Sequence, residues 1–212
     1  MRQKMDSLPD ELVIEALTNL TLEEVQNVCS ANRRIQRICN TKDFWFRMLN
    51  VHFPKVSTIG VTDPQSLYLS VRRNLARQQL LSVMDSLVWD LTQSTQKNLE
   101  SYSSITEVLT RPVTGLDRLV LYYPLSDRYY QRVEYDLKGL QVSPLQVLES
   151  IEIFYDQPIT WDNVAAIERE SGDALDYVEL TPNSTALQLL NVRTFLTGMR
   201  PFQDGFLLTL EY

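Results

Sequence analysis

The amino-acid sequence predicts an α+β protein, in which an all-helical N-terminal domain precedes a small α+β domain with a short antiparallel sheet. Apolar residues recur at helical spacing through residues 1–54. Residues 105–212 instead contain runs rich in aromatic and β-branched residues, separated by turn residues. We therefore expect a helical domain over 1–54, a helical extension and linker over 55–104, and an α+β domain over 105–212.

Composition and charge exclude several classes of partner. The chain has 212 residues, of which 44% are hydrophobic and 22% are charged, as is typical of globular proteins. No apolar run approaches the roughly 20 residues that cross a bilayer, and no apolar stretch follows the basic N-terminus as in a secretory signal. Residues 81–212 hold 9 Lys and Arg against 19 Asp and Glu, which disfavours contact with nucleic-acid phosphates. We expect an intracellular protein with no nucleic-acid or membrane partner.

The first helix is predicted from the stretch LPDELVIEALTNL at residues 8–20. Pro9 suits the first helical position, where its missing N–H would have had no partner. Asp10 and Glu11 follow in the first turn, where the helix dipole favours negative charge. The apolar stripe consists of Leu12, Val13, Ala16, Leu17 and Leu20. Because this helix is short and strongly apolar, we expect a partner's surface to cover it.

Three further short helices are expected before residue 55. Thr21 and Glu24 have the spacing of a capping box and open a second helix, which breaks at Asn32. A third segment covers residues 33–39, and Thr41 caps a fourth helix that Pro54 stops. Helices of about ten residues are marginal in isolation, so these must be held by packing.

The remaining elements follow from periodicity and turn residues. A helix begins near residue 67 and either runs on to about 90 or breaks near Gln78; residues 93–104 form a connector or a frayed helix end. A β-hairpin is expected at 117–124 and 128–137, helices at 143–158 and 160–171, and strands at 177–180 and 206–212. Residues 183–199 are ambiguous by period.

No constellation of reactive residues predicts an enzyme. The six glycines never adopt the spacing of a phosphate-binding loop, and the nucleophile elbow and zinc-protease motifs are absent. The only histidine, His52, lies among apolar neighbours, so we expect a packed or surface residue rather than a general base. The acidic pairs Glu168/Glu170 and Asp173/Asp176 are expected to be solvated charge. We therefore predict no catalytic residue, no cofactor and no metal site.

The cysteines and the paired tyrosines raise two further questions, the first about oxidation state and the second about orientation. Cys29 and Cys39 lie ten residues apart in amphipathic helical segments, and we expect two buried, reduced thiols because the chain lacks the ligands of a zinc site. Tyrosine pairs at 122–123 and 129–130 flank the predicted hairpin turn. Strand alternation would direct half of each pair to the core, and a protein interface is the alternative.

The stretch LPDELVIEALTNLTLEEVQNVCSANRRIQRICNTKDFW resembles the F-box family. The family pattern is a Leu-Pro start, an acidic residue soon after, apolar residues at helical spacing and a final Trp about 36 residues on. This sequence departs from it at Ile35 and Gln36, where the family often has an aromatic residue, and after Cys29, where Arg or Lys is common.

The resemblance implies a three-helix unit that docks on the Skp-type adaptor of cullin–RING ubiquitin ligases, while the rest of the chain recruits a target. By carry-over from the family, the adaptor-contact set comprises Leu8, Pro9, Leu12, Leu17, Leu22, Val25 and Ile38. The partner of residues 105–212 would be a target or a sister protein.

The continuation DFWFRMLNVHFPKV and the tail of the sequence resemble F-box-like proteins of large DNA viruses. This resemblance implies a viral protein that acts in the host cytoplasm. The alternative is a structural or minor virion component that uses the F-box-like fold for assembly contacts.

Overall fold

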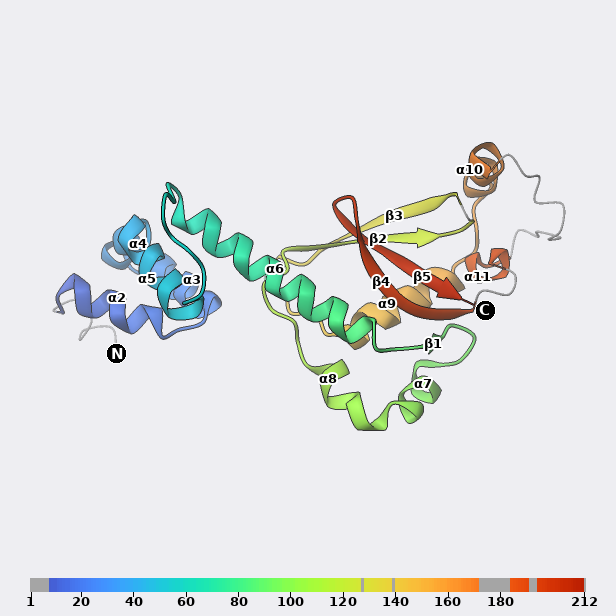
Figure 1. Ribbon diagram of the computed structural model, residues 1–212, viewed down its shortest axis with the longest axis horizontal. Helices are drawn as coiled ribbons and strands as arrows, with labels where there is room; N and C mark the ends of the chain where they lie inside the picture. Colours follow the sequence, from blue (N-terminus) through green and yellow to red (C-terminus); the bar gives the residue numbers. More distant parts are fainter. Residues whose placement is uncertain (1–7, 127, 139, 172–183, 191–193, 212) are drawn as a thin grey trace. The chain divides into compact units, whose positions relative to one another are not determined.

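The computed structural model describes residues 8–126, 128–138, 140–171, 184–190 and 194–211 (Figure 1). The chain divides into two compact units, Met1–Asn74 and Leu75–Tyr212. Their boundary falls inside helix α6 (Pro64–Met84). The compact units therefore do not follow the predicted boundaries at 54 and 104, because the first half of α6 belongs to the N-terminal unit.

The N-terminal unit contains α2 (Asp10–Thr18), α3 (Leu22–Ala31), α4 (Arg33–Cys39), α5 (Lys42–His52) and the first half of α6. The predicted capping box is confirmed: the Glu24 N–H donates to the Thr21 hydroxyl over 3.3 Å, and the Glu24 carboxylate accepts from the Thr21 N–H over 2.8 Å. Asn32 ends α3 and Thr41 caps α5, as predicted, and Asn32 also caps α4. Pro9 is the N-cap of α2, whereas the sequence predicted it at the first helical position.

The helices of this unit bury a core of their own. Val13, Leu17 and Phe44 are fully buried, and Tyr68 of α6 is 2% exposed. The Tyr68 ring lies 5.5 Å from that of Trp45 and 5.1 Å from that of Phe53, between ring centroids. The first half of α6 thus completes the core, which explains why the compact unit extends beyond residue 54.

The C-terminal unit contains the second half of α6 and eleven further elements in its described part. In chain order these are β1 (Trp89–Asp90), α7 (Thr95–Ser101), η1 (Ser103–Ile105), α8 (Thr106–Thr110), β2 (Arg118–Pro124), β3 (Tyr130–Asp136), α9 (Pro144–Asp156), α10 (Trp161–Ser171), α11 (Ala186–Leu189), β4 (Phe195–Phe202) and β5 (Gly205–Glu211).

The strands form one sheet in the order β1-β4-β5-β2-β3. The predicted hairpin is confirmed, since β2 and β3 pair antiparallel from Arg118↔Asp136 to Pro124↔Tyr130. The sheet is nevertheless not purely antiparallel: β5 lies parallel to β2, paired at Leu121↔Phe206 and Tyr122↔Leu207. Parallel pairing requires a long connection, and the one between these strands contains β3, helices α9 to α11 and β4.

Helix α9 runs across one face of the sheet (Figure 1). Its buried residues Leu148, Ile151 and Tyr155 share a core cluster with strand residues such as Leu121 and Phe206. The opposite face, which we call the outer face, carries a separate small cluster of Val120, Tyr122 and Leu207, with Tyr130 and Phe202 packed against it. The strand alternation therefore supplies two apolar faces, of which α9 covers one.

Several elements differ from the sequence predictions. Helix α6 continues through Gln78, as one of the two predicted alternatives has it, but ends at Met84, short of residue 90. Residues 93–104, predicted as a connector or a frayed helix end, contain α7 and the start of η1. The ambiguous segment resolves into α11 and the start of β4 in its described part. The predicted strand 177–180 and the pair Asp173/Asp176 lie outside the described residues. No helix in the described ranges has the length and apolar character to cross a membrane.

Candidate functional site

Helix α2 presents two different sides. Val13 and Leu17 are fully buried, whereas Leu12 is 48% exposed. Pro9 and Ala16 are exposed as well, and their spacing places them on the same side of the helix as Leu12. Leu8 is half-buried where the chain enters this side. We call Leu8, Pro9, Leu12 and Ala16 the leucine–proline face.

A basic residue of α4 fixes the entry of the chain into α2. The Arg34 guanidinium donates to the Leu8 carbonyl and pairs with the Asp10 carboxylate. Asn32 positions Arg34, because its side-chain oxygen accepts from the Arg34 N–H over 2.8 Å. The leucine–proline face is therefore held in place before any partner arrives, which lowers the ordering cost of binding.

Only part of the predicted adaptor-contact set lies at the surface of the unit. Four of its seven residues are core residues of the unit: Leu17, Leu22, Val25 and Ile38 are between 0% and 5% exposed. Leu8, Pro9 and Leu12 reach the surface. An apolar helical period marks every buried position, whether a partner or the unit's own helices bury it, so the period alone does not select the docking residues. Ala16, which the predicted set omitted, lies on the exposed side.

His52 is packed, as predicted, and both of its ring nitrogens have partners. Nε2 lies 2.8 Å from the Thr18 carbonyl oxygen, and Nδ1 lies 2.6 Å from the Tyr68 hydroxyl. A carbonyl oxygen only accepts, so Nε2 carries the proton and Nδ1 accepts from the tyrosine. His52 thus fastens α5 to the end of α2 and to α6.

The expectation of two reduced thiols is wrong, because Cys29 and Cys39 form a disulfide with their Cα atoms 6.2 Å apart. This bond joins α3 to the last residue of α4. A cavity of about 260 Å³ lies beside it, with Trp45 and the amides of Gln26 and Gln65 among its lining residues. Among the residues that the structure describes, the buried indole N–H of Trp45 finds no hydrogen-bond partner.

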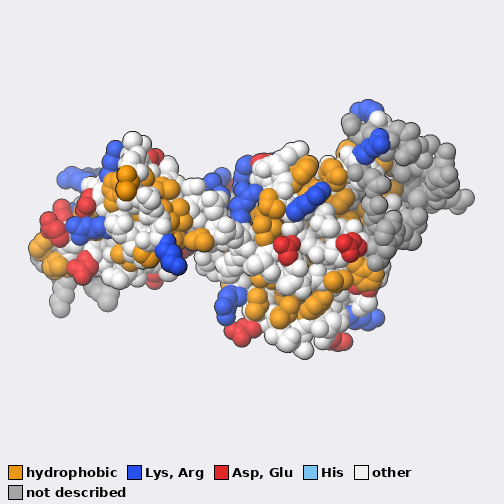
Figure 2. Space-filling model, in the orientation of Figure 1, with side chains coloured by type: hydrophobic (Ala, Val, Ile, Leu, Met, Phe, Trp, Pro, Cys, Tyr) orange, Lys and Arg blue, Asp and Glu red, His pale blue; other side chains and the backbone are white. Residues whose placement is uncertain are grey.

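Charged residues surround the turn between β4 and β5 on the outer face of the sheet. Arg132 lies 2.8 Å from Asp204 and 2.7 Å from Glu134, and the Tyr122 hydroxyl donates to Asp204 over 2.6 Å. The Arg132 guanidinium, and after it the Tyr122 hydroxyl, hold the pKa of the Asp204 carboxyl well below its usual value. Figure 2 shows hydrophobic side chains interspersed with charged ones on the face of this unit that it displays.

The tyrosine pair at 122–123 alternates as strand geometry predicts. Tyr123 points to the α9 side, where its ring stacks on Phe154 at 3.8 Å between centroids. Tyr122 points to the outer face, where its ring meets Phe202 edge-on at 4.9 Å. Both rings are nearly buried, so neither is available as the interface anchor that was the alternative.

Comparison with known proteins identifies the N-terminal unit. The F-box domain family matches residues 5–47, a range that includes α2, α3, α4 and half of α5. No curated protein and no solved structure matches the chain. The helical N-terminus of this α+β protein therefore contains an F-box domain.

Proposed function

We propose that this protein is a non-enzymatic adaptor, in which the F-box domain docks on a Skp-type subunit of a cullin–RING ubiquitin ligase and the C-terminal unit recruits a target. The match of residues 5–47 to the F-box domain supports the docking role. The single structural observation that carries it is the leucine–proline face, whose Leu12 is 48% exposed beside a fully buried Leu17. An exposed apolar strip on an otherwise well-packed helix is typical of a helix-face interface.

The revised contact set for this docking is Leu8, Pro9, Leu12 and Ala16. Leu17, Leu22, Val25 and Ile38 act from beneath by holding α2, α3 and α4 together. The F-box match extends over residues 5–47 only and carries no information on location or origin. An intracellular location and a viral origin therefore enter this proposal as expectations from the sequence.

Binding of the full-length chain to a purified Skp-type adaptor, measured by calorimetry, tests the proposal. We expect wild type to bind with a dissociation constant in the micromolar range or below. Leu12→Asp should weaken binding by about 30-fold or more, as loss of a central apolar anchor does. Leu8→Asp combined with Leu12→Asp should abolish it.

The matched control is Ile59→Asp, which makes the same kind of change at a residue 94% exposed between α5 and α6. This variant should bind like wild type. If wild type itself ignores the adaptor, the docking proposal is overturned, and the use of the fold for assembly contacts takes its place.

A further inference from the structure

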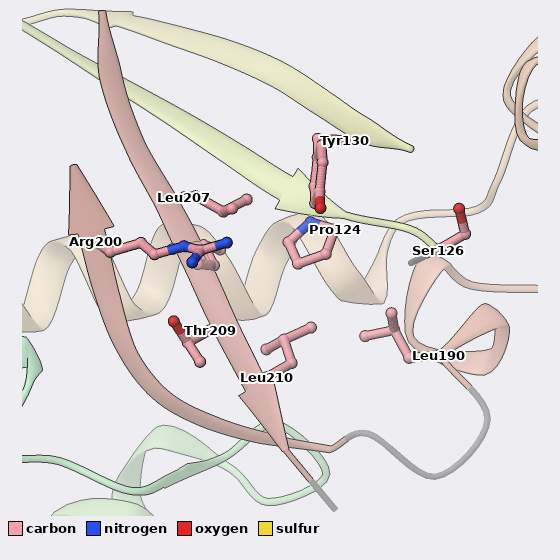
Figure 3. A pocket seen from close by; sticks show the side chains of 9 residues that line it. Pro124, Ser126, Tyr130, Leu190, Arg200, Leu207, Thr209 and Leu210 are labelled. Carbon is pink, nitrogen blue, oxygen red and sulfur yellow. The ribbon is translucent and has the colours of Figure 1, made fainter. Parts of the chain in front are cut away.

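The C-terminal sheet contains a cavity at the gap where two parallel strands separate, with lining residues from both the outer face and the α9 side. β2 and β5 pair at Leu121↔Phe206 and Tyr122↔Leu207, but β2 continues to Pro124 and β5 to Glu211 without further pairing between them. A cavity of about 260 Å³ opens in this region, with Pro124, Leu190, Arg200, Leu207 and Thr209 among its lining residues (Figure 3).

Arg200 brings an uncompensated positive charge to this cavity. Its register partner on β5 is Leu207, and Figure 3 shows its side chain reaching from β4 across β5 toward Leu207 and Pro124. The neighbouring cations Arg118 and Arg132 both pair with Asp204 and Glu134. Within the described ranges Arg200 has no carboxylate within 4 Å, although residues 81–212 are acidic overall.

The rest of the lining mixes leucine side chains with the hydroxyl-bearing residues Ser126, Tyr130 and Thr209. Leu207 and Leu190 are 3% and 7% exposed, and Leu210 adds a third leucine side chain. The side chains of Thr209 and Ser126 contribute hydroxyl groups. One cation beside a small leucine-lined cavity fits a ligand that carries a carboxylate and an apolar group close together.

We propose that this cavity binds the C-terminal residue of another protein, with the terminal carboxylate on Arg200 and the last side chain against Leu207, Leu190 and Leu210. A C-terminal residue with an apolar side chain offers both groups from one Cα, and the volume suits about one large side chain. The guanidinium of Arg200 can receive a carboxylate through two parallel hydrogen bonds. This inference deepens the proposed adaptor function, on which it rests for the role of the bound protein as a target.

Fluorescence anisotropy with labelled octapeptides Gly-Ser-Gly-Ser-Gly-Ala-Ala-X tests the proposal on the full-length chain without any adaptor. The peptides have a free C-terminus and differ only in the last residue X. We expect Leu, Ile, Met and Phe at X to bind more tightly than Asp, Lys or Gly. Amidation of the C-terminus should weaken the Leu peptide by about tenfold or more, because a charge-assisted pair is lost.

Two variants separate the carboxylate from the apolar cavity. Arg200→Gln changes an exposed side chain, and we expect it to bind the free acid and the amide equally weakly. Thr209→Phe fills the cavity from the outer face and should remove the preference for apolar X. Lys138→Gln is the matched control: it removes one exposed positive charge from the end of the β2–β3 hairpin and should bind like wild type.

Each other outcome overturns the proposal. Equal binding of acid and amide by wild type shows that no terminal carboxylate is read. Tighter binding of the internal sequence Gly-Leu-Ala-Asp-Ala-amide shows that a side-chain carboxylate is the true ligand. If no peptide binds at concentrations up to about 1 mM, the site is excluded, because weaker binding corresponds to non-specific contact. Adaptor binding by Arg200→Gln is measured separately and should be unchanged, so failure of this site is distinguishable from failure of the docking proposal.

Discussion

The contrast between Leu12 and Leu17 on helix α2 yields the sharpest prediction. These residues lie five positions apart, yet Leu17 is fully buried and Leu12 is 48% exposed. Truncating a fully buried leucine to alanine costs about 2–5 kcal/mol, through lost burial and the cavity left behind. The hydrophobic core of a unit of this size contributes only about 3–5 kcal/mol to the free energy of unfolding. Leu17→Ala should therefore bring the N-terminal unit close to unfolding at room temperature.

Leu12→Asp should behave in the opposite way. The side chain makes few contacts within the unit, so we expect the free energy of unfolding to change by about 0.5 kcal/mol or less. Its effect should appear in adaptor binding alone. Leu17→Ala should lose adaptor binding only to the extent that the unit unfolds.

Hydrogen exchange followed by mass spectrometry distinguishes these effects, because it reports on each unit separately. In Leu17→Ala, amides of α2 and α5 should lose protection while those of β2 and β5 keep it. In Leu12→Asp, protection should match wild type throughout. Equal loss of protection in both variants would refute the assignment of one side of α2 to the core and the other to a partner.

Three further predictions concern stability. Cys39→Ser should destabilise the N-terminal unit by about 2–3 kcal/mol in urea denaturation, because the disulfide joins residues ten positions apart and so constrains the unfolded chain. Equal stability of the wild-type protein with and without reductant would contradict this prediction. Asp204→Asn should lower the melting temperature at pH 7. Because the folded-state pKa of Asp204 is depressed, the stability that its carboxylate contributes is present above the unfolded-state pKa of about 3.9 and fades as the pH falls below that value. The melting temperatures of wild type and Asp204→Asn should therefore converge in acid. A difference in melting temperature that stays constant down to pH 2 would argue against this reasoning. Gly205→Ala should destabilise the sheet by about 1–3 kcal/mol or more, since the added Cβ would lie 2.3 Å from the Val120 carbonyl oxygen; an unchanged melting temperature would exclude this close approach.

Local signals in the sequence predicted the elements well where capping chemistry is explicit. Thr21 with Glu24 and Thr41 each have a side chain that satisfies N–H groups of the first turn, so residue type alone indicates a helix start. The hairpin was likewise predictable, because runs rich in aromatic and β-branched residues lie on both sides of a short turn. The parallel pairing of β2 with β5 was not, since no local pattern records which distant strand becomes a neighbour.

The candidate site was predictable in outline but not in detail. Helical spacing correctly placed apolar residues on α2, yet it could not distinguish Leu12 from Leu17, because which side faces the core depends on how α4 and α5 pack. The disulfide was missed for a related reason: ten residues separate Cys29 and Cys39, and only the turn at Asn32 brings α3 and α4 together. Arg200 carried no signal, because its lack of a carboxylate partner among the described residues is a property of the folded sheet.

The position of β5 has a consequence for the order in which the chain acquires structure. β5 spans residues 205–211 and lies between β4 and β2, so the interior of the sheet is incomplete until these residues have left the ribosome. The helices of the N-terminal unit contact one another over short sequence distances and can form while synthesis continues. During translation, the nascent chain should therefore carry a folded F-box domain beside strands that still expose unpaired backbone, and that interval is when chaperones would protect it.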